Sequence, residues 1–228
     1  MNPVAASTGF DEIVRSRRSV RAFRAVSIAP SILVEIFDLA RTAPSIFNTQ
    51  PWHVHVLAGG AKSRLSDAIF HANATNACPP YAVFPKPVPT PCAERQQEFG
   101  RQYYATLGIN RDDALSREGQ TSRNFVFFNA PIGLIVTIDA ALGKHSWLDV
   151  GLFLQNLMLA AWARGLSTCP QVSFVRYQAV IAKALNLKPQ ETVVCGMSLG
   201  YADDRAAVNQ MQMPRARVDQ FTTWSGFD

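Results

Sequence analysis

Two short segments near the amino terminus carry the side chains best suited to bind a ligand. The first is Arg17-Arg18-Ser19-Val20-Arg21, with three guanidinium groups and one hydroxyl in five positions. Arginine matches phosphate oxygens with paired N–H donors, and in an extended backbone Arg17, Ser19 and Arg21 would point to one side. The segment therefore predicts a phosphate-binding site. A solvated basic helix end is the plainer alternative, and it is equally common.

The second segment covers residues 43–52 and reads Ala-Pro-Ser-Ile-Phe-Asn-Thr-Gln-Pro-Trp. Asn48 and Gln50 can each donate and accept hydrogen bonds, as the edge of an imide-like ring requires. Pro44 and Pro51 stiffen the backbone on either side, although Asn and Pro are also favoured in ordinary turns. Together with the arginine segment, this pattern indicates a bound mononucleotide, and a flavin fits it best.

Residues 168–171, Thr-Cys-Pro-Gln, form a third candidate after a long predicted helix. There, Pro170 and the backbone N–H that follows it could meet the edge of a planar ring. The alternative is a simple connection from a helix to a strand.

The segment 196–200, Gly-Met-Ser-Leu-Gly, matches the nucleophile elbow of serine hydrolases. In that fold the catalytic histidine follows the serine in the chain, but the last histidine here is His145. We therefore reject a hydrolase and expect Gly200 to carry the end of a strand past the ligand.

His53 and His55 alternate on a predicted strand and would share one face. No Asp, Glu or Cys is expected beside them, so we interpret both as half-buried strand residues and predict no metal site. The chain also lacks G-x-G-x-x-G and P-loop motifs, which disfavours a Rossmann dinucleotide fold and an ATPase.

Composition favours one globular domain over residues 1–228, because 48% of the residues are hydrophobic and 17% are charged. The net charge of +5 is modest, and no basic run interleaved with aromatic residues predicts nucleic-acid binding. The four cysteines lack CxxC spacing, and no segment has the pattern of a signal peptide or a membrane span. We expect a soluble protein in the reducing cytoplasm.

Hydrophobic periodicity predicts more helix than strand, in an α+β or three-layer α-β-α arrangement with a small central sheet. A proline-rich loop is predicted near 79–91, and a C-terminal arm begins at about residue 203. The helix at 148–164 is apolar nearly all round, so its own domain or a partner chain must cover it. The predicted helices lie at about 10–17, 30–43, 60–75, 93–107, 112–119, 148–164 and 177–186, and the strands at 52–57, 132–138 and 192–199.

These segments, in this order, resemble the motifs of the FMN-dependent nitroreductase superfamily over nearly the whole chain. The resemblance rests on residues 17–23, 43–52, 149–165, 169–171 and 196–201. The stretch 124–131 and the closing Gly226-Phe227-Asp228 look most like bacterial members that act on nitrobenzoates, nitrobenzenes and dinitroanilines.

The resemblance implies a mainly antiparallel sheet in an intertwined homodimer, with two FMN sites at the subunit interface. The 148–164 helix would form the dimer core, and the C-terminal arm would wrap the partner. Carried over by position, the phosphate group would be held by Arg17, Ser19, Gly200 and Arg215, with Arg18 nearby and Arg217 as the alternative to Arg215.

The ring of FMN would meet two further groups of residues. Arg21 would approach the N1–C2 carbonyl side as an electrostatic stabiliser, and the Gln171 backbone N–H would face N5 beside Pro170. The other subunit would contribute Pro44, Ser45, Asn48 and Gln50.

The implied activity is NAD(P)H-dependent reduction of nitroaromatic compounds by a ping-pong mechanism, giving nitroso and then hydroxylamino products. The flavin carries the redox chemistry, so no acid–base triad is expected. Two alternatives remain open from the sequence. One is a flavoenzyme of the same fold with a quinone, enone or halogenated aromatic acceptor, or with flavin-consuming chemistry. The other is a non-catalytic flavin-binding protein.

Overall fold

The computed structural model describes residues 3–78, 84 and 86–227, and its centre is one four-stranded sheet. The strand order is β1-β2-β4-β3, and every neighbouring pair is antiparallel. Three of the strands are rich in apolar residues, and the fourth reads Ser-Thr-Cys-Pro-Gln. The strands are β1 (Trp52–Ala58), β2 (Ile132–Asp139), β3 (Ser167–Gln171) and β4 (Glu191–Gly200).

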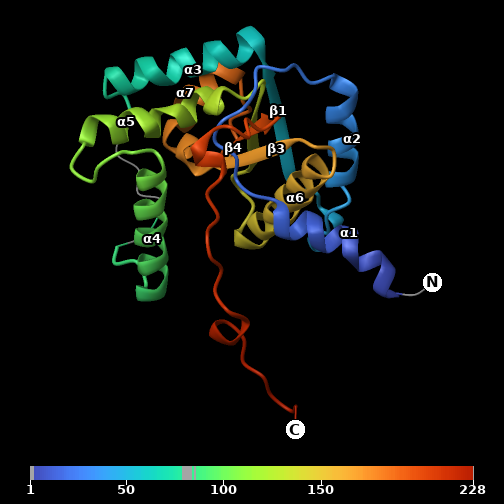
Figure 1. Cartoon of the computed structure of the whole chain (residues 1–228). Helices are drawn as coiled ribbons and strands as arrows, with labels where there is room; N and C mark the ends of the chain where they lie inside the picture. The colour runs from blue at the N-terminus through green and yellow to red at the C-terminus, as the bar shows by residue number, and fades with distance from the viewer. Residues whose placement is uncertain (1–2, 79–83, 85, 228) are drawn as a thin grey trace.

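The described part of the chain contains seven α-helices, four of which cover the sheet. Helices α2 and α6 pack on one face, where Ile36 and Leu157 meet Leu134. Helices α3 and α7 cover the opposite face, as Figure 1 shows, and enclose Ile135 of β2. The helices are α1 (Pro3–Ser16), α2 (Pro30–Ala40), α3 (Gly59–Ala74), α4 (Thr90–Thr106), α5 (Ala114–Ser122), α6 (Lys144–Trp162) and α7 (Gln178–Leu185).

The predicted three-layer α+β class with an antiparallel sheet is confirmed, but several boundaries differ. Helix α4 begins at Thr90 rather than near residue 93, since Pro91 is tolerated in the first turn. Helix α6 begins at Lys144, four residues before its predicted start. Residues 168–171 lie within strand β3, so the plain helix-to-strand connection is wrong there. Much of the predicted proline-rich loop, residues 79–83 and 85, lies outside the described residues.

Strand β4 contains a bulge, so the side chains that precede it point to the opposite face of the sheet from the one that strict alternation predicts. Val136 of β2 is paired with Cys195, but the next residue, Thr137, is paired with Val193, so the register steps over Val194. Cys195 accordingly packs on the α6 side, whereas Val193 packs in the cluster on the α3–α7 side. A bulge of this kind re-aims the side chains beyond it.

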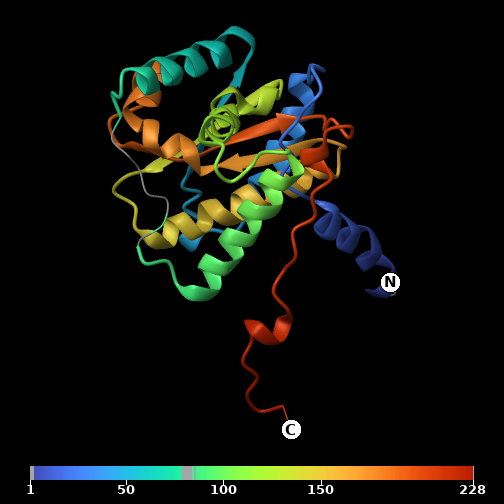
Figure 2. The ribbon, with the colours of Figure 1, turned by 60° about the vertical axis from the view of Figure 1, so that its left-hand side comes forward.

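The carboxyl-terminal arm projects away from the layered body in both views (Figures 1 and 2), and helix α4 extends downward at the left in Figure 1. The arm carries Phe221, Trp224 and Phe227, whose exposed fractions are 68%, 65% and 76%. Three large apolar side chains on an extended arm form an unusual solvent-facing surface. Among the described helices, none combines the length and the apolar character needed to cross a bilayer.

Close packing beneath β4 leads to a first prediction. A Cβ atom added at Gly196 would clash with the ring of Phe174, which is fully buried and stacks on Phe127. We expect Gly196→Ala to lower the free energy of unfolding by about 1–3 kcal/mol, measured by urea denaturation, because the core must shift.

Gly119→Ala in α5 is the matched control, since nothing lies within 4 Å of its added Cβ. Alanine is the better helix former, so this variant should be as stable as the native chain or up to about 1 kcal/mol more stable. Equal urea midpoints for Gly196→Ala and the native chain would contradict the packing argument.

Candidate functional site

The predicted phosphate-binding segment lies beside β3, an edge strand of the sheet. Ser19 forms a parallel bridge with Thr168 of β3, and the Val20 N–H donates to the Thr168 carbonyl at 3.0 Å. Val20 is completely buried, while Arg17 and Arg21 on either side line an open cleft. Arg18 and Ser19 line the same cleft, so the segment does not alternate strictly between cleft and core.

The cleft has a volume of about 700 Å³ and is strongly basic. Three segments distant in sequence form it: the arginine segment, helix α4 and the carboxyl-terminal arm. Five of its lining residues are arginines, and among the described residues that line it none is acidic. The lining residues are Arg17, Arg18, Ser19, Arg21, Arg95, Phe99, Met211, Met213, Pro214, Arg215, Ala216 and Phe221.

Uncompensated positive charge marks this cleft as an anion site. Burial lowers the pKa of Arg17, and repulsion from the nearby Arg215 lowers it further. In addition, the Nε atom of Arg18 is buried without a hydrogen-bond partner in the described chain. A buried donor without an acceptor is costly, and an anion in the cleft would relieve both the repulsion and the missing bond.

Arg21 is held differently from its neighbours. Its guanidinium lies 5.4 Å from the ring centre of Phe99 and 5.3 Å from that of Tyr103, both on α4. Its backbone N–H donates to Oδ1 of Asn209 at 2.8 Å. The aromatic faces favour the cation, and its Nη1 atom donates to the Ser19 carbonyl at 3.3 Å.

The two candidate arginines of the arm differ in their surroundings. Arg215 lines the cleft and hydrogen-bonds only to the backbone carbonyls of Met213 and Pro214 among the described residues. Arg217 instead forms two hydrogen bonds to the carboxylate of Asp219, at 3.1 and 3.2 Å. Arg217 is therefore neutralised locally, which favours Arg215 as the cleft residue.

Two residues that shape this cleft are absent from the sequence-based predictions. Arg95 lies one helical turn before Phe99, and this i, i+4 spacing was the only signal that both face the cleft. Asn209 is 1% exposed and donates to the carbonyls of Ala22 and Asp203. A buried asparagine in a polar tail has no sequence signature, so only the fold reveals it.

Gln171 ends strand β3 with its side chain buried and fully hydrogen-bonded. Its amide nitrogen donates to the Asn124 carbonyl at 2.7 Å, and its amide oxygen accepts from Ser198 at 2.7 Å. Ser198 is completely buried inside β4, so it is no nucleophile and the rejection of a hydrolase is confirmed. The neighbouring Pro170 is exposed, which leaves this strand edge accessible.

Gly200 is explained by packing. It is buried at the end of β4, opposite Ser167, and an added Cβ would lie 2.6 Å from Cδ of Pro131. It does not line the arginine cleft in the described structure. However, β4 ends beside β3, and Thr168 of β3 is bridged to Ser19 of the arginine segment.

The four residues predicted to come from another subunit form a separate exposed loop. Gln50 donates its backbone N–H to the Ser45 hydroxyl at 3.0 Å and its side-chain amide to Asn48. Phe47, Asn48 and Gln50 all have positive φ angles, and such strained backbone clusters at ligand sites. Pro44, Ser45, Asn48 and Gln50 are absent from the described lining of the arginine cleft.

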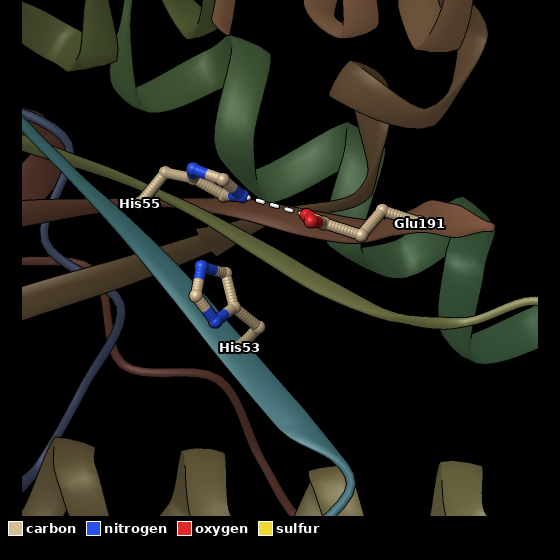
Figure 3. Close-up of side chains that lie close together, drawn as sticks. All are labelled: His53, His55 and Glu191. Carbon is tan, nitrogen blue, oxygen red and sulfur yellow. Dashed lines mark hydrogen bonds and ion pairs between the residues drawn. The ribbon is translucent and has the colours of Figure 1, made fainter. Parts of the chain in front are cut away.

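The expectation that no acidic residue lies beside His53 and His55 is wrong. Glu191, at the start of β4, places its Oε2 atom 2.9 Å from Nε2 of His55 (Figure 3). These residues are far apart in sequence and their strands are not adjacent, so spacing alone could not reveal the cluster.

Comparison with known proteins agrees with this geometry. The chain is 49% identical over 219 residues to the 4-nitrobenzoate reductase of Pseudomonas putida, covering 96% of each chain. It is 41% identical to the chloronitrobenzene nitroreductase of Comamonas testosteroni, covering 94% of this chain and 96% of the relative.

Solved structures give the same result. The FMN- and NADPH-dependent nitroreductase NfnB of Sphigopyxis sp. strain HMH superposes with a TM-score of 0.92 at 34% identity, over 95% of this chain and 99% of that one. The FMN-dependent NfnB of Mycobacterium smegmatis, solved in complex with NADPH, gives a TM-score of 0.89 at 34% identity, over 96% and 99%. The pattern described as "Nitroreductase family" matches residues 14–201, and the chain belongs to this family.

Proposed function

We propose that this protein is an FMN-dependent NAD(P)H oxidoreductase that reduces nitroaromatic compounds. The observation that carries the proposal is the cleft lined by five arginines, with no acidic residue among its described lining, in a chain 49% identical to a 4-nitrobenzoate reductase. Guanidinium groups suit the doubly charged phosphate of a mononucleotide.

The residues present fit FMN. The unpartnered Nε of Arg18 and the mutual repulsion of Arg17 and Arg215 both call for a bound anion. In the proposed arrangement, Arg17, Ser19 and Arg215 bind the phosphate, and Arg18 supplies further positive charge. Bound FMN supplies two-electron transfer between the nicotinamide and the acceptor.

Arg21 has an electrostatic role in the proposal. Phe99 and Tyr103 fix its guanidinium, so this charge is held in position before reaction. A preorganised cation stabilises negative charge that develops on a nearby ring, and it does so most strongly where water is excluded. Pro170 and the backbone N–H of Gln171, at the accessible edge of β3, are the proposed neighbours of that ring.

A homodimer completes the proposed site. Helix α6 exposes Trp147, Leu148 and Leu152 by 42%, 65% and 38%, and the arm exposes three more aromatic side chains. A partner chain covering these surfaces would bring its own loop, with Pro44, Ser45, Asn48 and Gln50, to the ring. The Asp149 carboxylate accepts from the Ile46 N–H at 3.2 Å, so the loop is anchored to the proposed dimer helix.

The proposed reaction is ping-pong, because a nicotinamide and a flat nitroarene would need the same ring face in turn. Successive two-electron reductions then give the nitroso and the hydroxylamino products. Another acceptor, such as a quinone, remains the second candidate, since nothing in the arginine cleft selects a nitro group.

The assignment of the arm arginine leads to a prediction. We expect Arg215→Ala to weaken FMN binding by about 10- to 100-fold, because a charge-assisted hydrogen bond contributes roughly 1.5–3 kcal/mol. Arg217→Ala is the control, since its charge is already paired with Asp219. Fluorescence titration of FMN measures both. An equal loss of FMN affinity in the two variants would contradict the assignment of Arg215, rather than Arg217, to the phosphate.

The activity itself is tested by absorbance. The purified protein should be yellow, and anaerobic NADPH or NADH should bleach it within the mixing time of a turnover assay. Adding 4-nitrobenzoate or nitrobenzene should restore the colour and yield a hydroxylamine. Bleaching with recovery by quinones but by no nitroarene would favour the second candidate, and no bleaching would indicate a non-catalytic flavin protein.

The dimer is tested at the exposed face of α6. Leu148→Glu should shift the protein toward monomer in analytical ultracentrifugation and reduce its FMN content, since a buried carboxylate would be unpaired. Leu115→Glu on α5, which is 82% exposed, is the matched control and should leave the mass unchanged. A dimer of native stability in Leu148→Glu would refute the proposed interface.

A further inference from the structure

Three metal-ligating side chains meet at the end of the sheet opposite to the arginine cleft. His53 and His55 come from β1, and Glu191 comes from the start of β4 (Figure 3). One potential ligand atom from each residue lies within 4.8 Å of the other two. The two imidazole rings are 4.7 Å apart between centroids.

The bulge in β4 brings Glu191 to the same face of the sheet as the two histidines. Strict alternation from Cys195 would turn Glu191 toward α6, on the far face from the histidines. Because the register steps over Val194, Glu191 instead shares the face of Thr137 and His55. Bulges that re-aim a side chain occur often beside functional sites.

Glu191 is well prepared to act as a ligand. Its side chain is 12% exposed, and its Oε2 atom accepts from Thr137 at 3.0 Å and lies 2.9 Å from Nε2 of His55. The contacts with His55 and Thr137 fix the orientation of this carboxylate.

We propose that His53, His55 and Glu191 bind one divalent transition-metal ion of the zinc class. Two imidazoles and one carboxylate form a donor set that zinc uses when it keeps a further position for water. Imidazole nitrogen also discriminates against magnesium and calcium, which prefer oxygen ligands.

The change needed for binding is small. Ligand bonds of about 2.0–2.2 Å in a tetrahedral site place donor atoms roughly 3.3 Å apart. His55 and Glu191 are already this close, and His53 is exposed, so its ring is free to rotate inward. Binding replaces the hydrogen bond between Nε2 of His55 and Glu191 with a bond to the metal, and the neutral imidazole that coordinates through Nε2 carries its one proton on Nδ1.

This site is independent of the proposed flavin site. Glu191 is the first residue of β4 and Gly200 is the last, so the two ends are about 30 Å apart along the strand. Metal binding at β1 would instead link an outer strand of the sheet to β4 across β2, and so stabilise the folded state.

The test is metal titration of the tag-free, FMN-loaded protein after treatment with a chelator. We expect one Zn²⁺ per chain by calorimetry, a rise in melting temperature with Zn²⁺ but not with Mg²⁺, and a visible absorption band with Co²⁺. His53→Ala should weaken Zn²⁺ binding by at least about 10-fold, because it removes a ligand. Glu191→Gln should do the same, and its amide keeps an acceptor for Thr137.

His145→Ala is the matched control, because His145 is an exposed histidine on α6 outside the cluster. It should bind Zn²⁺ as the native protein does. The FMN absorbance of each variant reports folding, so a failure of metal binding is distinguishable from a failure of the flavin site. Absent binding, or equal Zn²⁺ affinity in His53→Ala and His145→Ala, would overturn the proposal and leave a hydrogen-bonded pair beside a surface histidine.

Discussion

Like charges held together without a counter-charge are the constraint on which this structure depends. Arg17, Arg18, Arg21, Arg95 and Arg215 converge on one cleft, and no acidic residue is among its described lining. Such a cluster persists only because a well-packed frame holds its backbone: Val20 is completely buried and bonds to Thr168. The sheet provides the rigidity, and the charge then selects an anionic ligand.

Much of the fold could be predicted from local patterns. The spacing of apolar residues distinguishes a helix from a strand, and it predicts the long apolar helix and the alternating strands correctly. The predicted start of helix α4 is wrong because the first turn of a helix accepts a proline, here Pro91. Strand β3 was missed because Ser167–Gln171 is short and contains a proline, and only its pairing with β4 makes it a strand.

The candidate site was predictable only where its residues are close in sequence. The arginine segment was found because three guanidiniums occur in five positions, whereas Arg95 and Asn209 join it through tertiary contacts alone. The histidine–glutamate cluster was missed for the same reason. The cluster forms between two strands that are not neighbours in the sheet, and it depends on a bulge that the composition does not predict.

Asn209 joins both ends of the chain at one point. Its side chain bonds to the backbone of Arg21 and Ala22 near the amino terminus, and to Asp203 where the arm leaves the body. Asn209 therefore helps to hold the arginine segment and the arm together, alongside the backbone hydrogen bonds from Asp203 to Ala22 and from Arg24 to Tyr201. Loss of order where the arm leaves the body would thus reach the amino-terminal arginines directly, through the Asn209 side chain and these backbone bonds.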